Sequence, residues 1–395
     1  MDQRRLRKSI EQELQDNLLP FWRERSLDHA RGGFVAEMTN DGALREDAPK
    51  GLILNARLLW TFSALYRELG DERDRALARR AYEYIEHYFR DPDYGGYLWR
   101  VDSEGQPLDV TKKVFGQAAC VHALSEYHRA TGDADALSSA AETCNLIERH
   151  AHDARFGGYV EVLGADWSPV GDLRLGDKDM NAARCMNSHL YILEAYTTLH
   201  GVWPNPVVAG RLRELIRLID ERMLTPSGHF GLFFDEQWKA RSDSYKYGLD
   251  IKGAWLPREA AAALGDKELE AQVSKRAVEV ATAVLREGLD QEGGLVYAGR
   301  DGKAIDASRE WWPQAEAMVG FWHAYRLTKE AKFAEAVARV WAFIEKRIVD
   351  RVQGEWFWRV RADGSVDERE PKVSEWKDPY HAVRMCLEMM RALEE

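Results

Sequence analysis

Cysteine is scarce in this sequence, and no segment of it resembles a membrane span. The four cysteines of the 395 residues stand far apart, at Cys120, Cys144, Cys185 and Cys386, and form no CxxC pair. Such spacing favours reduced, buried thiols over a disulfide framework. No apolar run reaches the ~18 residues of a transmembrane helix, and the charged stretch Met1–Lys8 lacks the apolar core of a signal peptide. We therefore expect a cytoplasmic protein that does not enter a membrane.

Net positive charge is lacking as well. The chain has 55 Lys and Arg against 66 Asp and Glu, a formal charge of −11, which argues against a nucleic-acid partner. The sequence also has no HExxH, no Cys/His cluster, no EF-hand loop and no glycine-rich phosphate loop after a strand. No GxSxG nucleophile motif occurs. We expect neither a metal nor another cofactor.

Glycine, in contrast, recurs at regular intervals. One or two glycines followed by an aromatic or apolar residue occur six times, roughly 60 to 70 residues apart. The motifs lie at Gly32–Phe34, Gly95–Tyr97, Gly157–Tyr159, Ser227–Phe230, Gly293–Leu295 and Gln353–Trp356. Six near-equal spacings indicate a repeat architecture.

Each repeat contains helix and hairpin signals. Apolar residues such as Leu54, Leu58 and Leu65 recur at helical spacing, and a Gly-Asp pair at Gly70, Gly132 or Gly265 is a typical helix end. Asx-Gly turns after the glycine motifs predict short hairpins.

Two helices and one short hairpin therefore make up a repeat. Six repeats predict an all-α fold, an (α/α)6 barrel of six helical hairpins with short β-hairpins at one mouth, in one domain over residues 1–395. An open solenoid is the alternative, but it normally needs polar capping repeats, and we see none.

Four segments place polar side chains where an inner helix would otherwise be apolar. They are Asn55–Arg57, Asn187–His189, Trp312–Glu316 and Trp376–Arg384. An Arg in so apolar a helix either pairs with a buried carboxylate or faces a cavity, and a lone His there is more often a satisfied core residue. Together with 14 Trp and 15 Tyr, the four segments describe a sugar pocket, because aromatic faces suit sugar rings.

The same segments, in this order and spacing, resemble the N-acylglucosamine 2-epimerase superfamily, most closely its cellobiose 2-epimerase branch. The resemblance covers nearly the whole chain, from Leu19 to Glu388. It implies an (α/α)6 barrel that epimerises or isomerises free reducing sugars without a redox cofactor. The implied chemistry opens the pyranose ring and removes the C2 proton to give a cis-enediolate. Protonation at C2 on the other face then gives the epimer, and protonation at C1 gives the ketose.

The resemblance also implies roles for individual residues. The catalytic set would be His381 as one of two histidines that flank C2, His189 for ring opening and Arg57 at the enediolate oxygen. The substrate-binding set would be Asn187, Trp312, Glu316, Trp376, Lys252, Lys113, Phe115 and Arg384, with the two Trp side chains stacking on sugar rings and Glu316 orienting a hydroxyl.

Several substitutions depart from the family pattern in the predicted pocket. The other flanking His of the family lies in a Gly-His-Asp-Ile-Glu run, which here reads Gly248–Lys252 with Leu249 in place of the His and Lys252 in place of the Glu. Relatives often carry His and Tyr where this chain has Lys113 and Phe115. Leucine cannot transfer a proton, so the base set of this chain must differ.

Three hypotheses follow. The first is a sugar epimerase or aldose–ketose isomerase in which His381 acts alone or with Lys252, if burial lowers the pKa of that lysine. The second is a different sugar chemistry, hydrolysis or elimination, with Glu316 and Asp250 as the two carboxylates. The third is an inactive sugar-binding relative. Each expects a mono- or disaccharide as partner, and the chain would be a monomer or homodimer.

The charge of the predicted pocket gives one more hypothesis. If Lys252 and Lys113 face the cavity together with Arg57 and Arg384, four cations surround one ligand, which would favour an acidic sugar. The alternative is that Lys252 pairs with Glu316 or Asp250 while Lys113 points to solvent.

Overall fold

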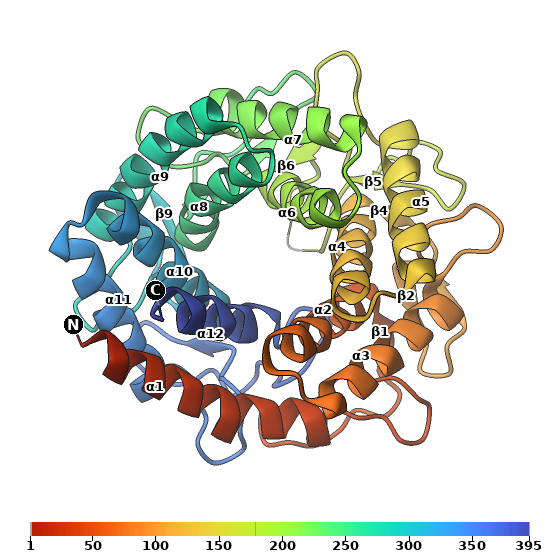
Figure 1. The fold of residues 1–395 in the computed structure, drawn as a ribbon, viewed down its shortest axis with the longest axis horizontal. Coiled ribbons are helices and arrows are strands. Elements are labelled where there is room, and N and C mark those ends of the chain that lie inside the picture. The colour runs from red at the N-terminus through yellow and green to blue at the C-terminus, as the bar shows by residue number, and fades with distance from the viewer. Residues whose placement is uncertain (1, 178, 395) are drawn as a thin grey trace.

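The computed structural model describes residues 2–177 and 179–394. In these residues twelve α-helices form two concentric rings (Figure 1). The inner ring contains α2 (Leu52–Leu69), α4 (Val114–Thr131), α6 (Met186–Val202), α8 (Tyr247–Ala263), α10 (Trp311–Thr328) and α12 (Tyr380–Ala392). The outer ring contains α1 (Gln3–Glu13), α3 (Glu72–Tyr84), α5 (Ala134–His150), α7 (Pro206–Leu218), α9 (Lys267–Glu287) and α11 (Ala331–Phe343). The predicted (α/α)6 barrel is confirmed.

Gly-Asp pairs separate three inner helices, α2, α4 and α8, from the outer helix that follows. Gly70 has the left-handed conformation that ends α2, with φ 72°. Asp71 then caps α3 by accepting the N–H of Arg73. Gly132 and Asp133 do the same between α4 and α5. The predicted helix ends at these positions are confirmed.

All six glycine motifs form a tight turn closed by an antiparallel bridge, and the turns at 224–230 and 289–295 are one residue shorter than the other four. In each, the apolar residue after the glycine pairs antiparallel with the end of the preceding outer helix. The pairs are Leu27–Phe34, Arg90–Tyr97, His152–Tyr159, Leu224–Phe230, Leu289–Leu295 and Val349–Trp356. Outer helices reach these turns through π-helical segments at Leu14–Leu18, Phe21–Arg25, Ile85–Phe89, Ile219–Met223 and Ile344–Ile348.

Short antiparallel strands gather at the N-terminal ends of the inner helices. They form the groups β1 (Lys50–Gly51), β2 (Arg100–Val101) and β3 (Pro107–Asp109); β4 (Lys112–Lys113) and β5 (Val162–Leu163); β6 (Arg184–Cys185) and β7 (Phe233–Phe234); β8 (Tyr245–Lys246), β9 (Ala298–Arg300) and β10 (Lys303–Asp306); and β11 (Arg309–Glu310) and β12 (Arg359–Val360). The strands lie at one mouth, as predicted. Most pairs of these strands join one repeat to the next, and β2–β3 and β9–β10 are local hairpins. Single antiparallel bridges, such as Met38–Leu44 and Val360–Val366, close the predicted turns of other repeats. One of the short strands leads directly into each of five inner helices, α2, α4, α6, α8 and α10, and so fixes where that helix begins.

The inner helices are buried almost all round. In α2 every residue from Leu52 to Leu65 is buried, because neighbouring inner helices cover two sides and the outer ring covers a third (Figure 1). Such helices are apolar throughout instead of showing one apolar stripe. A polar side chain in them therefore needs a partner or a cavity.

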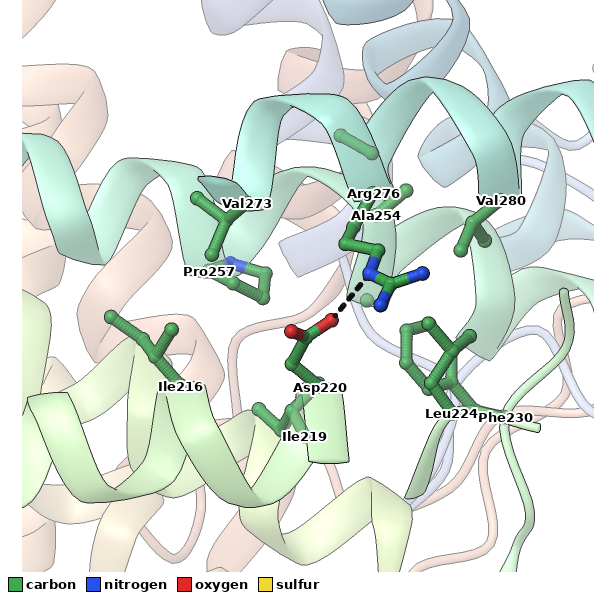
Figure 2. Close-up of a pocket in the computed structure, with 12 residues that line it drawn as sticks. Ile216, Ile219, Asp220, Leu224, Phe230, Ala254, Pro257, Val273, Arg276 and Val280 are labelled. Atoms are coloured by element: carbon green, nitrogen blue, oxygen red, sulfur yellow. Dashed lines mark ion pairs between the residues drawn. The ribbon is translucent and has the colours of Figure 1, made fainter. Parts of the chain in front are cut away.

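A small apolar cavity lies between α7, α8 and α9 (Figure 2). Asp220 and Arg276 close it with an ion pair of 3.1 Å. Its volume of about 20 Å³ is close to that of a single water, so it is too small for a sugar.

No helix in the described residues combines the length and apolarity needed to cross a membrane.

Candidate active site

A much larger cavity, of about 660 Å³, opens at the strand-bearing mouth. This volume is typical of small-molecule sites. Its lining comes from the strands that precede the inner helices, the first turns of those helices, and residues 172–177 and 179. Nine of the residues selected from the sequence line it: Arg57, Lys113, Phe115, Asn187, Leu249, Lys252, Trp312, Trp376 and His381.

His381 has one ring nitrogen held in place and the other free. Nδ1 lies 2.6 Å from Oε1 of Glu316 on α10. With this carboxylate as acceptor, Nδ1 carries the proton and Nε2, which no described residue hydrogen-bonds, is left as a base. Burial and the charges of Arg57, Lys252 and Arg384 hold the pKa of His381 well below its usual value. The imidazole is therefore neutral, as a base must be, near pH 7.

Two carboxylates and two cationic side chains form a buried ion network next to His381. Arg384 contacts both Glu316 and Glu194, and Lys252 Nζ lies 2.9 Å from Glu194 Oε2. Burial alone would raise the pKa of Glu194, but the charges of Lys252 and Arg384 lower it, so this carboxylate is ionised. Glu316 and Arg384, predicted to bind substrate, are not among the cavity lining. Glu316 instead holds the His381 ring through Nδ1, and Arg384 in turn contacts Glu316.

Arg57 both pairs with a carboxylate and faces the cavity, so the two alternatives from the sequence hold together. Nη1 lies 2.8 Å from Asp378 Oδ2, and Nε donates to the Tyr191 hydroxyl at 3.2 Å. Nη2 has no hydrogen-bond partner in the described part of the chain and belongs to a residue that lines the cavity. An oxyanion bound here would receive a charged hydrogen bond.

His189 is not part of the cavity lining. Nδ1 lies 2.8 Å from the Cys185 carbonyl, and Nε2 accepts the N–H of Tyr159 at 3.0 Å. Burial lowers the pKa of His189 to about 4. Because the backbone occupies both ring nitrogens, none remains for a sugar. This placement gives the predicted ring-opening role no support and fits the alternative of a satisfied core histidine.

The position of His189 is the same in several repeats. The fourth residue of an inner helix accepts the N–H that follows a glycine motif. The pairs are Gln117 with Tyr97, His189 with Tyr159, Asp250 with Phe230 and Gln314 with Leu295. Asp250 also lies 2.7 Å from His229 and is absent from the cavity lining. The carboxylate pair proposed for hydrolysis, Asp250 and Glu316, thus has neither member in the lining.

Partly exposed aromatic rings form walls of the cavity. Trp312 donates from Nε1 to Glu310 at 3.0 Å, and its ring centroid lies 5.7 Å from that of His381. The ring of Trp376 lies 6.0 Å from that of Phe115. Flat aromatic rings in the wall of a cavity are suited to hold a sugar ring.

Lys113 and Lys252 both line the cavity with Arg57, as the first expectation from sequence had it, but Arg384 does not, and the partners of the two lysines are not the expected ones. Lys252 pairs with a carboxylate, but with Glu194 and not with Glu316 or Asp250. Lys113 donates to the Leu175 carbonyl at 2.8 Å and lies 4.6 Å from the Trp99 ring centroid. It therefore ties the segment around Leu175 to the start of α4, instead of pointing to solvent.

Leu249 lines the cavity from the first turn of α8. Among the described lining residues, His381 is the single histidine. Leu249 offers only a hydrocarbon surface, so the position where the family pattern has its second flanking histidine cannot move a proton here.

Several functional residues escaped the sequence reasoning. Tyr191 and Glu194 lie on α6 just after the selected segment Asn187–His189. Tyr297 and Trp358 are outside every selected segment. The last two lie two residues after a glycine motif, and their carbonyls accept the N–H of the first residue of α8 and α10. Their shared position, two residues after a glycine motif, is the sequence signal that could have identified Tyr297 and Trp358.

Among residues 2–177 and 179–394, no group of three or more His, Cys, Asp or Glu side chains could hold a metal ion.

The fold and this cavity together define a helical barrel with a sugar-sized pocket at one mouth. The family model of N-acylglucosamine 2-epimerase matches residues 32–385. The cellobiose 2-epimerase of Bacteroides fragilis is 40% identical over 98% of both chains. The solved cellobiose 2-epimerase of Bacillus thermoamylovorans B4167 superposes with a TM-score of 0.94 at 36% identity, over 98% of this chain and 99% of that one. A solved D-mannose isomerase, 21% identical with a TM-score of 0.84 over 97% and 96% of the two chains, shares the fold.

The chain therefore belongs to the N-acylglucosamine 2-epimerase family, a family of sugar epimerases and isomerases. The resemblance noted in the sequence is confirmed.

Proposed function

We propose that this protein is an aldose–ketose isomerase that acts on the reducing end of a saccharide through one base. One observation carries the proposal. His381 is the single histidine among the described residues that line the cavity, and Leu249 takes the place of a second.

The geometry supports a proton transfer on one face of the sugar. His381 Nε2 removes the C2 proton of the open-chain aldose, the C2–H electron pair forms the C1=C2 bond, and the carbonyl pair moves to O1. Arg57 is placed to stabilise that oxyanion. Glu316 and Arg384 hold the imidazolium, which returns the proton to C1 and leaves a ketone at C2. No group on the other face is required.

Cellobiose is the first substrate to test, because the 40%-identical relative is a cellobiose 2-epimerase. That similarity also makes 2-epimerisation the second candidate function. Epimerisation by proton transfer needs a carrier on each face of C2, and the lining offers no imidazole for the second face.

The experiment is a proton NMR assay with cellobiose and a panel of reducing mono- and disaccharides. We expect a ketose product in the wild type without added metal. A C2 epimer as main product supports the second candidate, a cleaved glycosidic bond supports hydrolysis, and binding without turnover supports an inactive relative. Each of these three outcomes contradicts the isomerase proposal.

A variant at the base tests the mechanism. His381→Gln should lower the rate by about 10²-fold or more, the usual scale for an acid–base group. Glutamine can still donate to Glu316, so the melting temperature should change little. Retained turnover in this variant would rule out His381 as the base.

A further inference from the structure

Aldose–ketose isomerisation moves two protons, whereas epimerisation at C2 exchanges only one on carbon. The carbon proton goes from C2 to C1, and the hydroxyl proton goes from O2 to O1. His381 accounts for the first transfer. The second requires a group that can both give and take a proton beside two neighbouring oxygens. This step rests on the proposed function.

Lys252 is an unused proton carrier in the cavity. It stands one turn after Leu249 on α8, so both side chains share one helix face, and both line the cavity. Its Nζ lies 2.9 Å from Glu194 and 5.0 Å from the ring centroid of Tyr191. An ammonium has three N–H donors. Lys252 has no other polar partner in the described residues, so donors remain for a ligand.

The same tyrosine also contacts Arg57. The Arg57 guanidinium carbon lies 5.4 Å from the Tyr191 ring centroid, and its Nε reaches the hydroxyl at 3.2 Å. Both cations therefore lie near one aromatic ring, and both line the cavity. A cis-enediolate has two adjacent oxygens, O1 and O2, so two donors fit it better than one.

The two cations differ in what they can do. Arginine is always protonated in proteins, so Arg57 can stabilise an oxyanion but cannot carry a proton. Lysine can release its proton when it is desolvated. Burial lowers the pKa of Lys252 from its usual value, in the direction that this transfer needs.

We propose that Lys252 carries the hydroxyl proton from O2 to O1 and so makes this site an isomerase instead of a 2-epimerase. After His381 has taken the C2 proton, the Lys252 ammonium protonates O1 and becomes an amine. The amine then takes the proton of the O2 hydroxyl and is an ammonium again. The O2 electron pair forms the C2=O2 bond, the C1=C2 pair takes the proton from His381 at C1, and all protons and charges balance.

Glu194 and Arg384 limit the electrostatic cost of deprotonating Lys252 within a buried site. While Lys252 is an amine, Arg384 still contacts Glu194, so the carboxylate is never left without a cation. The substitutions at Leu249 and Lys252 thus have one explanation. The first removes the proton carrier that epimerisation needs, and the second supplies the one that isomerisation needs.

The test compares two rates in D2O for each variant: deuterium entering C2 of the recovered aldose, and ketose formation. Their ratio does not depend on how much of the variant is folded. Lys252→Arg keeps the cation beside Glu194 but cannot carry a proton. We expect C2 exchange to persist while ketose formation falls by about 10-fold or more, so that the ratio rises. Lys252→Gln combined with Glu194→Gln, which removes both charges, should raise it as well.

Two outcomes contradict this inference. If Lys252→Arg keeps the wild-type ratio, the lysine acts only through its charge. If both rates fall together in both variants, its role is structural. A wild type that forms no ketose contradicts the proposed function instead, and His381→Gln, which should abolish both rates, separates the two failures.

Discussion

Two histidines of similar sequence context have opposite roles at the scale of single residues. His381 keeps one ring nitrogen free, whereas His189 has both bonded to the backbone. The sequence could not separate them, because both lie in apolar helices. The repeat position separates them, since the equivalent residues in α4 and α10 are glutamines that bind the same turn.

His189→Gln is therefore expected to be nearly silent. The glutamine can accept the Tyr159 N–H, as Gln117 and Gln314 accept theirs, so turnover should remain within about 3-fold of the wild type. His189→Ala leaves that N–H unpaired and should destabilise the fold by about 1–3 kcal/mol. Steady-state kinetics and thermal melts check both. A loss of about 10²-fold in His189→Gln with an unchanged melting temperature would restore the ring-opening role.

Leu249→His should add a second product. An imidazole at this cavity-lining position can protonate the face of C2 that His381 does not reach, so the C2 epimer should appear beside the ketose. Leu249→Met, which keeps the apolar character, is the matched control. If the epimer is absent from the histidine variant, or is already formed by the methionine variant, Leu249 does not determine the reaction.

At the scale of elements, the glycine motif that α8 binds, Ser227–Phe230, contains a histidine that contacts two carboxylates. His229 occupies the place of the second glycine and lies 2.7 Å from Asp250 and 2.9 Å from Glu287 on α9, stacked on Tyr245. This links the helix that carries Leu249 and Lys252 to the outer ring. The spacing of the six motifs predicted the repeats from sequence, but not the ion cluster that His229 adds to this turn.

The His229 cluster should make stability depend on pH. Burial opposes protonation, but the two carboxylates raise the pKa of His229 above its usual value. A raised pKa stabilises the fold below the unfolded value of about 6.5 and loses this effect as pH rises through the folded value. His229→Gln should cost about 3 kcal/mol near pH 6, and less at higher pH. Chemical denaturation at several pH values measures the difference in free energy of unfolding between the wild type and the variant. If that difference stays constant with pH, His229 is not protonated in the fold.

At the scale of the whole molecule, most of the cations that line the described part of the cavity have carboxylate partners. Five of its cationic residues are paired with carboxylates: Arg57, Arg100, Arg174, Lys252 and Arg359. Of the other two lining cations, Lys113 donates to the Leu175 carbonyl and Lys246 lies 5.2 Å from the Tyr297 ring centroid. Six carboxylates line the described part of the cavity, and Asp172 and Glu370 among them are two of the partners just named: Asp109, Asp172, Asp177, Asp179, Glu310 and Glu370. The hypothesis of an acidic sugar considered the cations of the pocket without these carboxylate partners. Their positions cannot be predicted from composition alone.

We therefore expect a neutral sugar to be the better ligand. Its KM should change less than about 2-fold between low salt and about 0.5 M salt, because screening affects a neutral ligand little. A uronate of the same sugar should bind no better. Tighter binding of the uronate that weakens with salt would return the acidic-ligand hypothesis.

The path of a single hydrogen tests one-base isomerisation most directly. An aldose deuterated at C2 is converted in ordinary water, and the ketose is analysed by NMR for deuterium at C1. Because His381 takes and returns the proton on one face, we predict that a measurable part of the label arrives at C1, on one of its two hydrogen positions only. A C2 epimer without label as the main product would show a carrier on each face and contradict the account.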